Sequence, residues 1–137
     1  MDKQEILKNI NARMKGTMVE HLGIIITDIG KEYICGKMPV DNRTVQPYGL
    51  LHGGASVVLA ESLGSIGGNM TVDMNNKTVV GVEINANHLK SVNSGWVKGE
   101  ARALKIGRRL QVWRIQITNE SGENVCDSRL TLAVVNR

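Results

Sequence analysis

The chain has 137 residues, of which 42% are hydrophobic and 22% charged, and its formal net charge is +4. This length supplies one hydrophobic core, so residues 1–137 are expected to form a single domain. The composition is that of an ordinary globular protein and excludes a chain that is disordered throughout.

The N-terminal part of the chain predicts a helix followed by a β-hairpin. Segment 2–15 has apolar residues at helical spacing, and Gly16 supplies a stop, which is typical of an amphipathic helix. Segment 23–29 is rich in β-branched residues, and segment 32–40 alternates between apolar and polar residues. A turn at Gly30-Lys31 would join these two segments as strands.

A loop, a long helix and four strands are expected in the rest of the chain. They are a loop at 41–51, a helix from about 53 to 70, and strands from 78 onward and at about 95–106, 109–118 and 125–135. Because the later strands are joined mostly by short turns, neighbours must pair antiparallel. The apolar helix needs burial on nearly all sides, which a sheet curling around it provides. The sequence therefore predicts an α+β fold.

One acidic residue stands alone in the apolar helix. Between Arg43 and Asp73, Glu61 is the only acid and His52 the only histidine. A single carboxylate is costly to bury unless it is paired or neutralised. Glu61 is therefore the leading candidate for chemistry, and the alternative is a buried acid held by structural hydrogen bonds.

The cysteines and histidines indicate neither a disulfide framework nor a metal site. Cys35 and Cys126 form no Cys-x-x-Cys motif, and the three histidines lack ligand spacing. The chain also has no Gly-x-Ser-x-Gly nucleophile elbow. The first residues do not form a secretory signal, and polar residues and glycines interrupt the apolar stretch 53–72. We expect a cytoplasmic protein with reduced thiols, no metal and no membrane span.

Positive charge is concentrated in segment 76–114. This segment carries eight Lys and Arg against two Glu, which gives +6, while the rest of the chain sums to −2. A localised cationic segment suits an anionic partner, either a nucleic acid or a phosphorylated small molecule. Because the chain has two Tyr, two Trp and no Phe, it is poorly supplied for base stacking. We therefore expect a phosphorylated ligand and no nucleic acid.

Four short motifs in combination resemble one known family. They are Met-Pro-Val-Asp at 38–41, Gln-Pro-Tyr-Gly-Leu-Leu-His-Gly-Gly at 46–54, Ala-Glu at 60–61 and Gly-Val-Glu-Ile-Asn-Ala-Asn-His at 81–88. Over nearly its whole length the chain resembles hotdog-fold acyl-CoA thioesterases, in particular the branch with phenylacetyl-CoA and 1,4-dihydroxy-2-naphthoyl-CoA hydrolases. The resemblance implies a hotdog fold, with a curved antiparallel sheet around one long central helix, here preceded by an N-terminal helix.

The resemblance also implies roles for residues near the central helix. Glu61 would be the nucleophile or the general base of a thioester hydrolase. Gln46 and His52 would lie near the thioester carbonyl, and the backbone N–H of Gly53 would polarise it. Ser65 would help to position Glu61 or a water molecule. The alternatives are that His52 only caps or orients the loop, that Gln46 fixes the backbone, and that Ser65 is present for its small size.

Three places are implied for coenzyme A, which is part of the substrate and not a cofactor. They are Gly81, the run His88-Leu89-Lys90-Ser91 and the turn Lys105-Ile106-Gly107-Arg108-Arg109-Leu110. Arginine and lysine near a glycine turn suit the phosphates of coenzyme A. The alternative for the turn is a solvated edge that deters strand addition. No cofactor is expected.

Helix geometry predicts that one subunit cannot complete such a site. Gly53 lies at the helix N-terminus, where free N–H groups suit a developing oxyanion. Glu61 lies eight residues later, about 12 Å along the helix axis. Two helices packed antiparallel about a two-fold axis near Val57 would place Gly53 of one chain beside Glu61 of the other. We expect a dimer as the catalytic unit, and the resemblance implies dimers or tetramers.

The expected function is hydrolysis of an aromatic or medium-chain acyl-CoA to the free acid and coenzyme A. Two alternatives stay open. A non-catalytic acyl-CoA sensor would bind the ligand without turnover, although no helix-turn-helix pattern is present. A hotdog dehydratase would also use a histidine and a glutamate, but the Gln-Pro-x-Gly-x-x-His-Gly-Gly loop does not support it.

Overall fold

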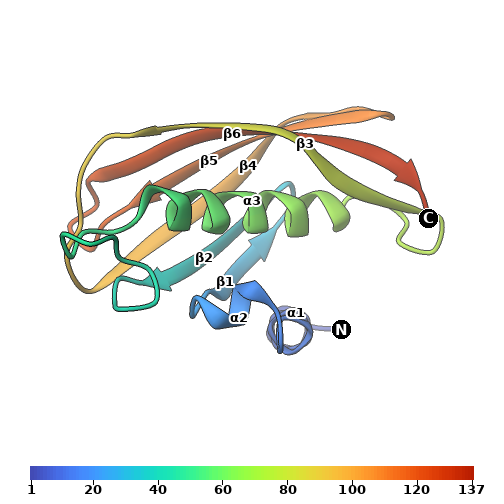
Figure 1. Ribbon diagram of the computed structural model, residues 1–137. Coiled ribbons are helices and arrows are strands. Elements are labelled where there is room, and N and C mark those ends of the chain that lie inside the picture. Colours follow the sequence, from blue (N-terminus) through green and yellow to red (C-terminus); the bar gives the residue numbers. More distant parts are fainter.

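A six-stranded antiparallel sheet curls around one long helix (Figure 1). The computed structural model describes residues 1–137. The helices are α1 (Lys3–Arg13), α2 (Met18–His21) and α3 (Gly53–Asn69). The strands are β1 (Ile25–Gly30), β2 (Tyr33–Pro39), β3 (Lys77–His88), β4 (Trp96–Ile106), β5 (Leu110–Thr118) and β6 (Asn124–Asn136). Their order across the sheet is β1-β2-β4-β5-β6-β3, so β1 and β3 are its edges.

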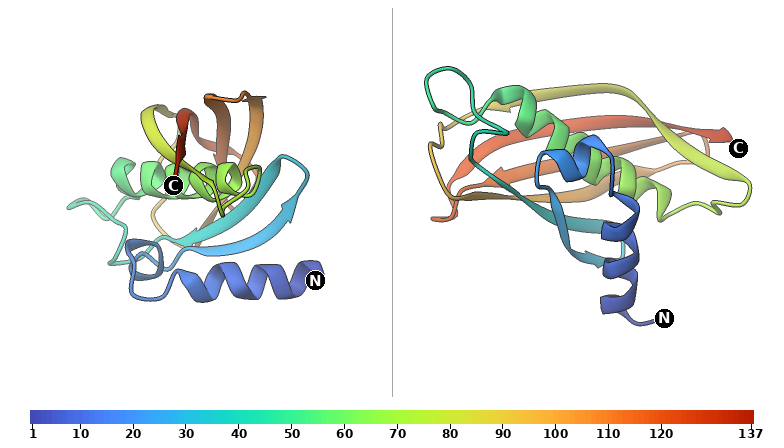
Figure 2. Two further views of the ribbon diagram at one scale, coloured as in Figure 1. Left: turned by 90° about the vertical axis from the view of Figure 1, so that its right-hand side faces the viewer. Right: turned by 60° about the horizontal axis from the view of Figure 1, so that its bottom comes forward.

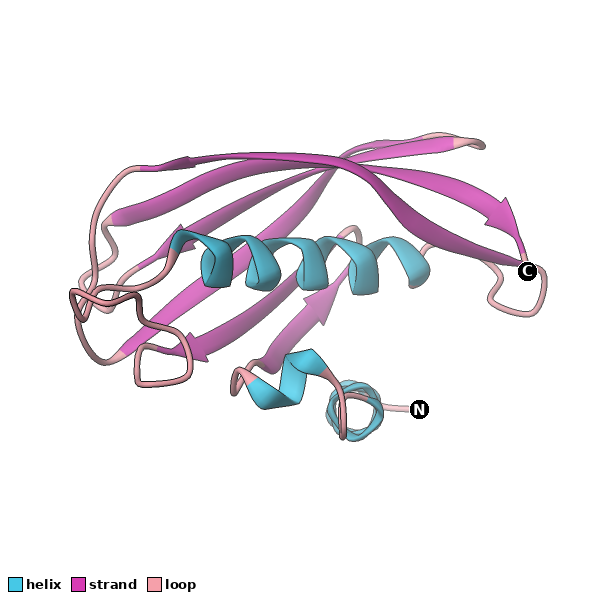
Figure 3. Ribbon diagram, in the orientation of Figure 1, coloured by secondary structure: helices cyan, strands magenta, loops and turns pink.

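The central helix α3 lies directly on the concave face of the sheet (Figure 3). Small residues make this close packing possible: a Cβ at Gly64 would come within 2.5 Å of the Leu130 side chain, and one at Gly68 within 2.6 Å of Leu132. Without those Cβ atoms the helix backbone can approach the strands. Leu59 and Leu63 of α3 are fully buried in the same interface.

Hydrogen bonds fix the C-terminal end of α3 to β5. The indole N–H of Trp113 donates to Oε1 of Gln111 (2.9 Å), and Nε2 of Gln111 donates to Oγ1 of Thr71 (2.7 Å). The Thr71 hydroxyl in turn donates to the carbonyl of Gly68 (2.7 Å). Gln111 is fully buried, and a buried polar side chain is tolerated because these bonds satisfy it.

The two edges of the sheet differ in how they are protected. At β1, the Asn11 side chain accepts from the N–H of Ile26 and donates to its carbonyl, both at 2.9 Å, as a neighbouring strand would. Helix α1 thus covers this edge (Figure 2). At β3, no element covers the edge, and Val80 and Val82 are 47% and 60% exposed. An open edge strand with exposed valines is a surface for pairing with another chain.

The expected α+β fold is confirmed, but several details differ from the sequence prediction. Most element ends shift by one or two residues, so that the helix predicted at 2–15 is Lys3–Arg13 and the strand predicted at 23–29 is Ile25–Gly30. Helix α2 was not predicted, because four residues are too short to show a period. The turn lies at Lys31-Glu32 and not at Gly30-Lys31, since Glu32 adopts a φ of 61° and Gly30 ends β1. Strand β3 extends one residue earlier than expected. No helix is both long and apolar enough to cross a membrane.

Candidate active site

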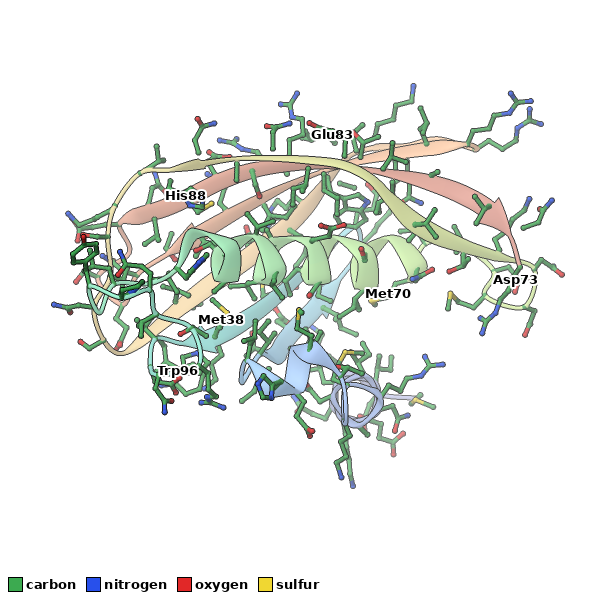
Figure 4. All side chains as sticks on the ribbon, in the orientation of Figure 1. Met38, Met70, Asp73, Glu83, His88 and Trp96 are labelled. Carbon is green, nitrogen blue, oxygen red and sulfur yellow. The ribbon has the colours of Figure 1, made fainter.

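A groove of about 430 Å³ opens at the N-terminal end of α3. It collects residues from the loop before α3, from the first turn of the helix and from the end of β3. Figure 4 shows His88 beside the start of α3, whereas Met70 lies at the other end of the helix. We call this groove the loop groove. The residues that line it include Gln46, Gly53, Ser56, His88, Leu89, Lys90 and Ser91.

Gly53 presents a free backbone N–H in the loop groove. Nδ1 of His52 accepts from the N–H of Gly54 at 2.8 Å, so that donor is satisfied. The N–H of Gly53 has no acceptor in the chain. A Cβ at this position would come within 2.8 Å of Nε2 of His88, so the imidazole of His88 lies over the glycine. An unpaired N–H at a helix N-terminus is suited to bind an oxygen that gains negative charge.

Gln46 both fixes its loop and leaves donors free. Its Oε1 accepts from the N–H groups of Tyr48 (2.6 Å) and Leu50 (3.3 Å). The oxygen of Gln46 therefore fixes the backbone of the loop, which is the alternative considered for this residue. The side-chain nitrogen makes no hydrogen bond within the chain, so its two N–H donors are available to a ligand in the loop groove.

Glu61 lies in a second groove of about 400 Å³, on the side of α3 that faces the N-terminal helices. Ser65 lines the same groove, together with Met14, which follows α1, two apolar residues of α2 and two of α3; we call it the carboxylate groove. Glu61 is half-buried and forms no hydrogen bond or salt bridge within the chain. Ser65 does not donate to it either. A Cβ at Gly81 would overlap Oε2 of Glu61, so the carboxylate reaches across to the open edge strand β3.

The two grooves do not meet within one chain. No residue lines both of them, and Gly53 and Glu61 are separated by about 12 Å along α3. The loop groove therefore holds the donors and the carboxylate groove holds the acid. His52 is exposed, caps α3 and lines neither groove. This position agrees with the alternative that His52 only caps the helix or orients the loop.

Two of the three places implied for coenzyme A lie at opposite ends of the sheet, whereas the third, Gly81, lies within β3 against the Glu61 carboxylate. His88 ends β3 next to the start of α3, and residues 88–91 line the loop groove. Lys90 is paired there with Glu123 at 3.3 Å. The turn 105–110 joins β4 to β5 at the other end, where the N–H of Gly107 donates to the carbonyl of Leu110 (2.8 Å). The cations of this turn form no salt bridge within the chain.

Comparisons with known proteins give the family. Residues 48–126 match the model of the thioesterase superfamily. The chain is 50% identical to 1,4-dihydroxy-2-naphthoyl-CoA hydrolase from Escherichia coli, over 94% of each chain. It is 49% identical to proofreading thioesterase EntH from Cronobacter sakazakii, over 94% of this chain and 93% of that one. This chain belongs to the thioesterase superfamily.

The solved structures agree with this assignment. A crystal structure of a thioesterase from Haemophilus influenzae matches with a TM-score of 0.92 and 49% identity, and the match covers 95% of this chain and 90% of that one. The fold is therefore the hotdog fold that the sequence motifs implied. The protein is a thioester hydrolase.

Several residues that line the two grooves were not predicted from the sequence. In the loop groove they are Ser56 and Val125, and in the carboxylate groove Met18 and Val19. Ser56 lies one helical turn after the helix N-terminus, which a helical wheel would have revealed. Met18 and Val19 belong to the unpredicted helix α2, and Val125 comes from a strand distant in sequence, so no local pattern identifies them.

The two thiols of the thioesterase are outside both grooves. Burial, followed by the nearby Glu100 carboxylate, raises the pKa of the Cys35 thiol to about 11. Burial also raises the pKa of Cys126, and Asp127 adds to the effect. Both cysteines are free. No cluster of three or more His, Cys, Asp or Glu residues is arranged to bind a metal.

Proposed function

We propose that this thioesterase hydrolyses acyl-CoA, with an aromatic or medium-length acyl group, and that Glu61 is its catalytic carboxylate. The observation that carries the proposal is the unpartnered, half-buried carboxylate of Glu61, held in an apolar groove beside the glycine of an edge strand. A group left without a structural partner in such a place is available to a substrate. The E. coli relative is named for an aromatic acyl-CoA.

The reaction uses the free donors and the acid on opposite sides of one carbonyl. The carbonyl oxygen accepts from the N–H of Gly53 and from the amide of Gln46, which stabilise its developing negative charge. The ionised carboxylate of Glu61 either takes a proton from water as it attacks or attacks the carbonyl carbon itself. The C–S bond then breaks, and the coenzyme A thiolate leaves and takes up a proton. If Glu61 itself attacks, the product of this step is an anhydride between Glu61 and the acyl group, and water then hydrolyses it to the free acid and the Glu61 carboxylate.

The acid and the donors belong to different subunits in this proposal. About 12 Å separates them within one chain, and two-fold pairing of α3 helices would remove that separation. The edges of the sheet favour one mode of pairing, because α1 covers β1 whereas β3 is open beside Glu61. Pairing of β3 with β3 of a second copy would bring Glu61 of the partner subunit to the loop groove. A tetramer of two such dimers stays a prediction.

The same proposed two-fold axis would also bring together the two distant coenzyme A segments. Residues 88–91 and the turn 105–110 lie at opposite ends of the sheet. Antiparallel pairing through β3 would bring the turn of one subunit toward residues 88–91 of the other. The free cations of the turn, Lys105, Arg108 and Arg109, would then contact phosphates of a coenzyme A whose thioester lies near Gly53. Both cysteines are free, which suits a reducing compartment, and we propose the cytoplasm.

Release of free thiol from benzoyl-, phenylacetyl- and hexanoyl-CoA tests the proposal. We expect turnover of at least one of them, and we expect Glu61→Gln to lower kcat by about 10³-fold or more. Glu5→Gln is the matched control, since Glu5 is an exposed acid on α1. Turnover that survives Glu61→Gln, or no turnover of any acyl-CoA, would overturn the assignment.

A further inference from the structure

Five of the six methionines of the chain lie along one apolar channel. The carboxylate groove, lined by Met14, Met18 and Ile66, continues into a second groove of about 380 Å³ that shares Met14 and Ile66 with it. Met1, Met70 and Met74 line this second part. The remaining methionine, Met38, is fully buried in the core. The channel runs between α3 on one side and α1 and α2 on the other.

We propose that this methionine channel binds the acyl chain of the substrate and that the N-terminal segment 1–22 sets the range of chains accepted. The inference rests on the proposed function, since it takes Glu61 as the acid at the thioester carbonyl. The occupant is a medium-length aliphatic acyl chain, extending from the carbonyl at Glu61 toward the C-terminal end of α3.

Continuity with the acid supports this occupant. Glu61 lies at the beginning of the channel, and Asn69 lies at its far part, eight residues later on the same helix. These eight residues correspond to about 12 Å, which is longer than one aromatic ring. The coenzyme A part leaves the carbonyl toward the loop groove, which carries the side chains of Gln46, His88 and Lys90, so the methionine channel remains for the acyl part.

The chemistry of the walls supports a broad range of chains. Methionine is unbranched, with three rotatable bonds and a polarizable sulfur, and adapts to ligands of different shape. Met18 is 63% exposed and Met70 is 42% exposed in the chain, so both can reorient without disturbing the core. Asn9, Arg13 and Asn69 add polar groups to the second groove. An acyl chain that outgrows the two grooves would have to pass these groups or enter water, so the channel predicts a limit on chain length.

A chain-length series from acetyl- to dodecanoyl-CoA with the full-length protein tests the inference. For the wild type we expect kcat/KM to rise by about fourfold for each added methylene until the channel is full. The double variant Met14→Ser with Met18→Ser should lower kcat/KM for decanoyl-CoA about tenfold or more and leave acetyl-CoA within about twofold. Met14→Trp, which fills the channel, should move the limit to shorter chains. Leu104→Ser is the control, since Leu104 is 52% exposed on β4 and does not line the channel.

Binding separates this inference from the proposed function. In a Glu61→Gln background without turnover, calorimetric titration should give tighter binding of decanoyl-CoA than of acetyl-CoA, and the two serine substitutions should remove the difference. An equal effect on all chain lengths, or an unchanged profile, would overturn the inference. A changed sedimentation coefficient with an unchanged profile would also overturn it, because the channel would then be a subunit contact. If binding depends on chain length as expected but the wild-type protein hydrolyses no acyl-CoA, only the proposed function is refuted.

Discussion

Glu61 and Gly81 form a pair in which the glycine leaves room for the acid. A Cβ at position 81 would overlap Oε2 of Glu61. The backbone of Gly81 does not adopt a positive φ, so conformation alone does not require glycine there. Its lack of a side chain therefore serves the position of the carboxylate.

Gly81→Ala should impair catalysis without unfolding the protein. The new Cβ displaces the Glu61 carboxylate, and a shift of about 1 Å in a reacting group can cost about 10²-fold in rate. We expect kcat to fall by about 10- to 100-fold while Tm stays unchanged or rises slightly. Steady-state kinetics and thermal unfolding measure the two effects. In a Glu61→Gln background the same substitution should cost nothing further, and a full additional loss would refute the coupling.

Lys90 is engaged by Glu123 before any ligand arrives. Their charged atoms are 3.3 Å apart. The pKa of Glu123 is lowered first by the hydrogen bond from the Asn119 side chain and then by Lys90. If Lys90 binds a phosphate, Glu123 competes with it. Glu123→Gln should therefore lower KM for acyl-CoA about two- to threefold at low salt, and the effect should fade at high salt. An unchanged or higher KM in Glu123→Gln would show that Lys90 does not bind the phosphates.

The thiols of the folded protein should be slow to react. With a pKa of about 11, only about one in a thousand Cys35 side chains is a thiolate at pH 8. Ellman's reagent should detect the two thiols promptly only after denaturation. Fast reaction of the native protein would contradict this environment for Cys35. Slow reaction also means that released coenzyme A can be followed without interference.

Helix α1 is attached to β1 by polar contacts that acid should weaken. Lys3 bonds to Oδ1 of Asp28 at 3.0 Å, and the Tyr33 hydroxyl donates to Oδ2 at 3.1 Å. The Lys3 bond, followed by that of Tyr33, lowers the pKa of Asp28 below its ordinary value of 3.8. A lowered carboxyl pKa stabilises the fold above the ordinary value, and this stabilisation is lost as the pH falls through the folded pKa.

Thermal unfolding between pH 7 and pH 2 measures this contribution. Tm should be nearly constant down to about pH 5 and should fall below about pH 4. Asp28→Asn should have a lower Tm at neutral pH and a shallower fall in acid, because its side chain does not titrate. Parallel curves for the two proteins would show that Asp28 contributes nothing to the acid dependence.

Elements with a clear period could be predicted from the sequence, and elements without one could not. The apolar helix α3 and the alternating strands were found because burial imposes periods of 3.6 and 2 residues. Helix α2 is four residues long and was missed. The order of the strands, with β3 at an edge beside β6, depends on contacts between distant segments that no local pattern encodes.

At the scale of the whole molecule, the residues of the site could be named before their arrangement was known. Glu61 is conspicuous as the one acid of an apolar helix, and Gln46 and Gly53 belong to motifs that resemble the family. Packing of distant elements forms the two grooves and the methionine channel, and it also brings Gly81 next to Glu61. These features could be identified only from the structure.

The shared site is the central claim, and mixing of two inactive variants tests it most directly. Glu61→Gln removes the acid. Gly53→Pro removes the free N–H at the first helical position, which tolerates proline, and its ring also displaces the imidazole of His88. This variant should lower kcat by about 10²- to 10³-fold. Each variant alone should be almost inactive. Subunit exchange in an equal mixture makes half of the dimers mixed, and each mixed dimer has one intact site, so about one quarter of the wild-type activity should return. Activity that stays at the level of the separate variants after exchange would place the acid and the donor in the same subunit and contradict the account.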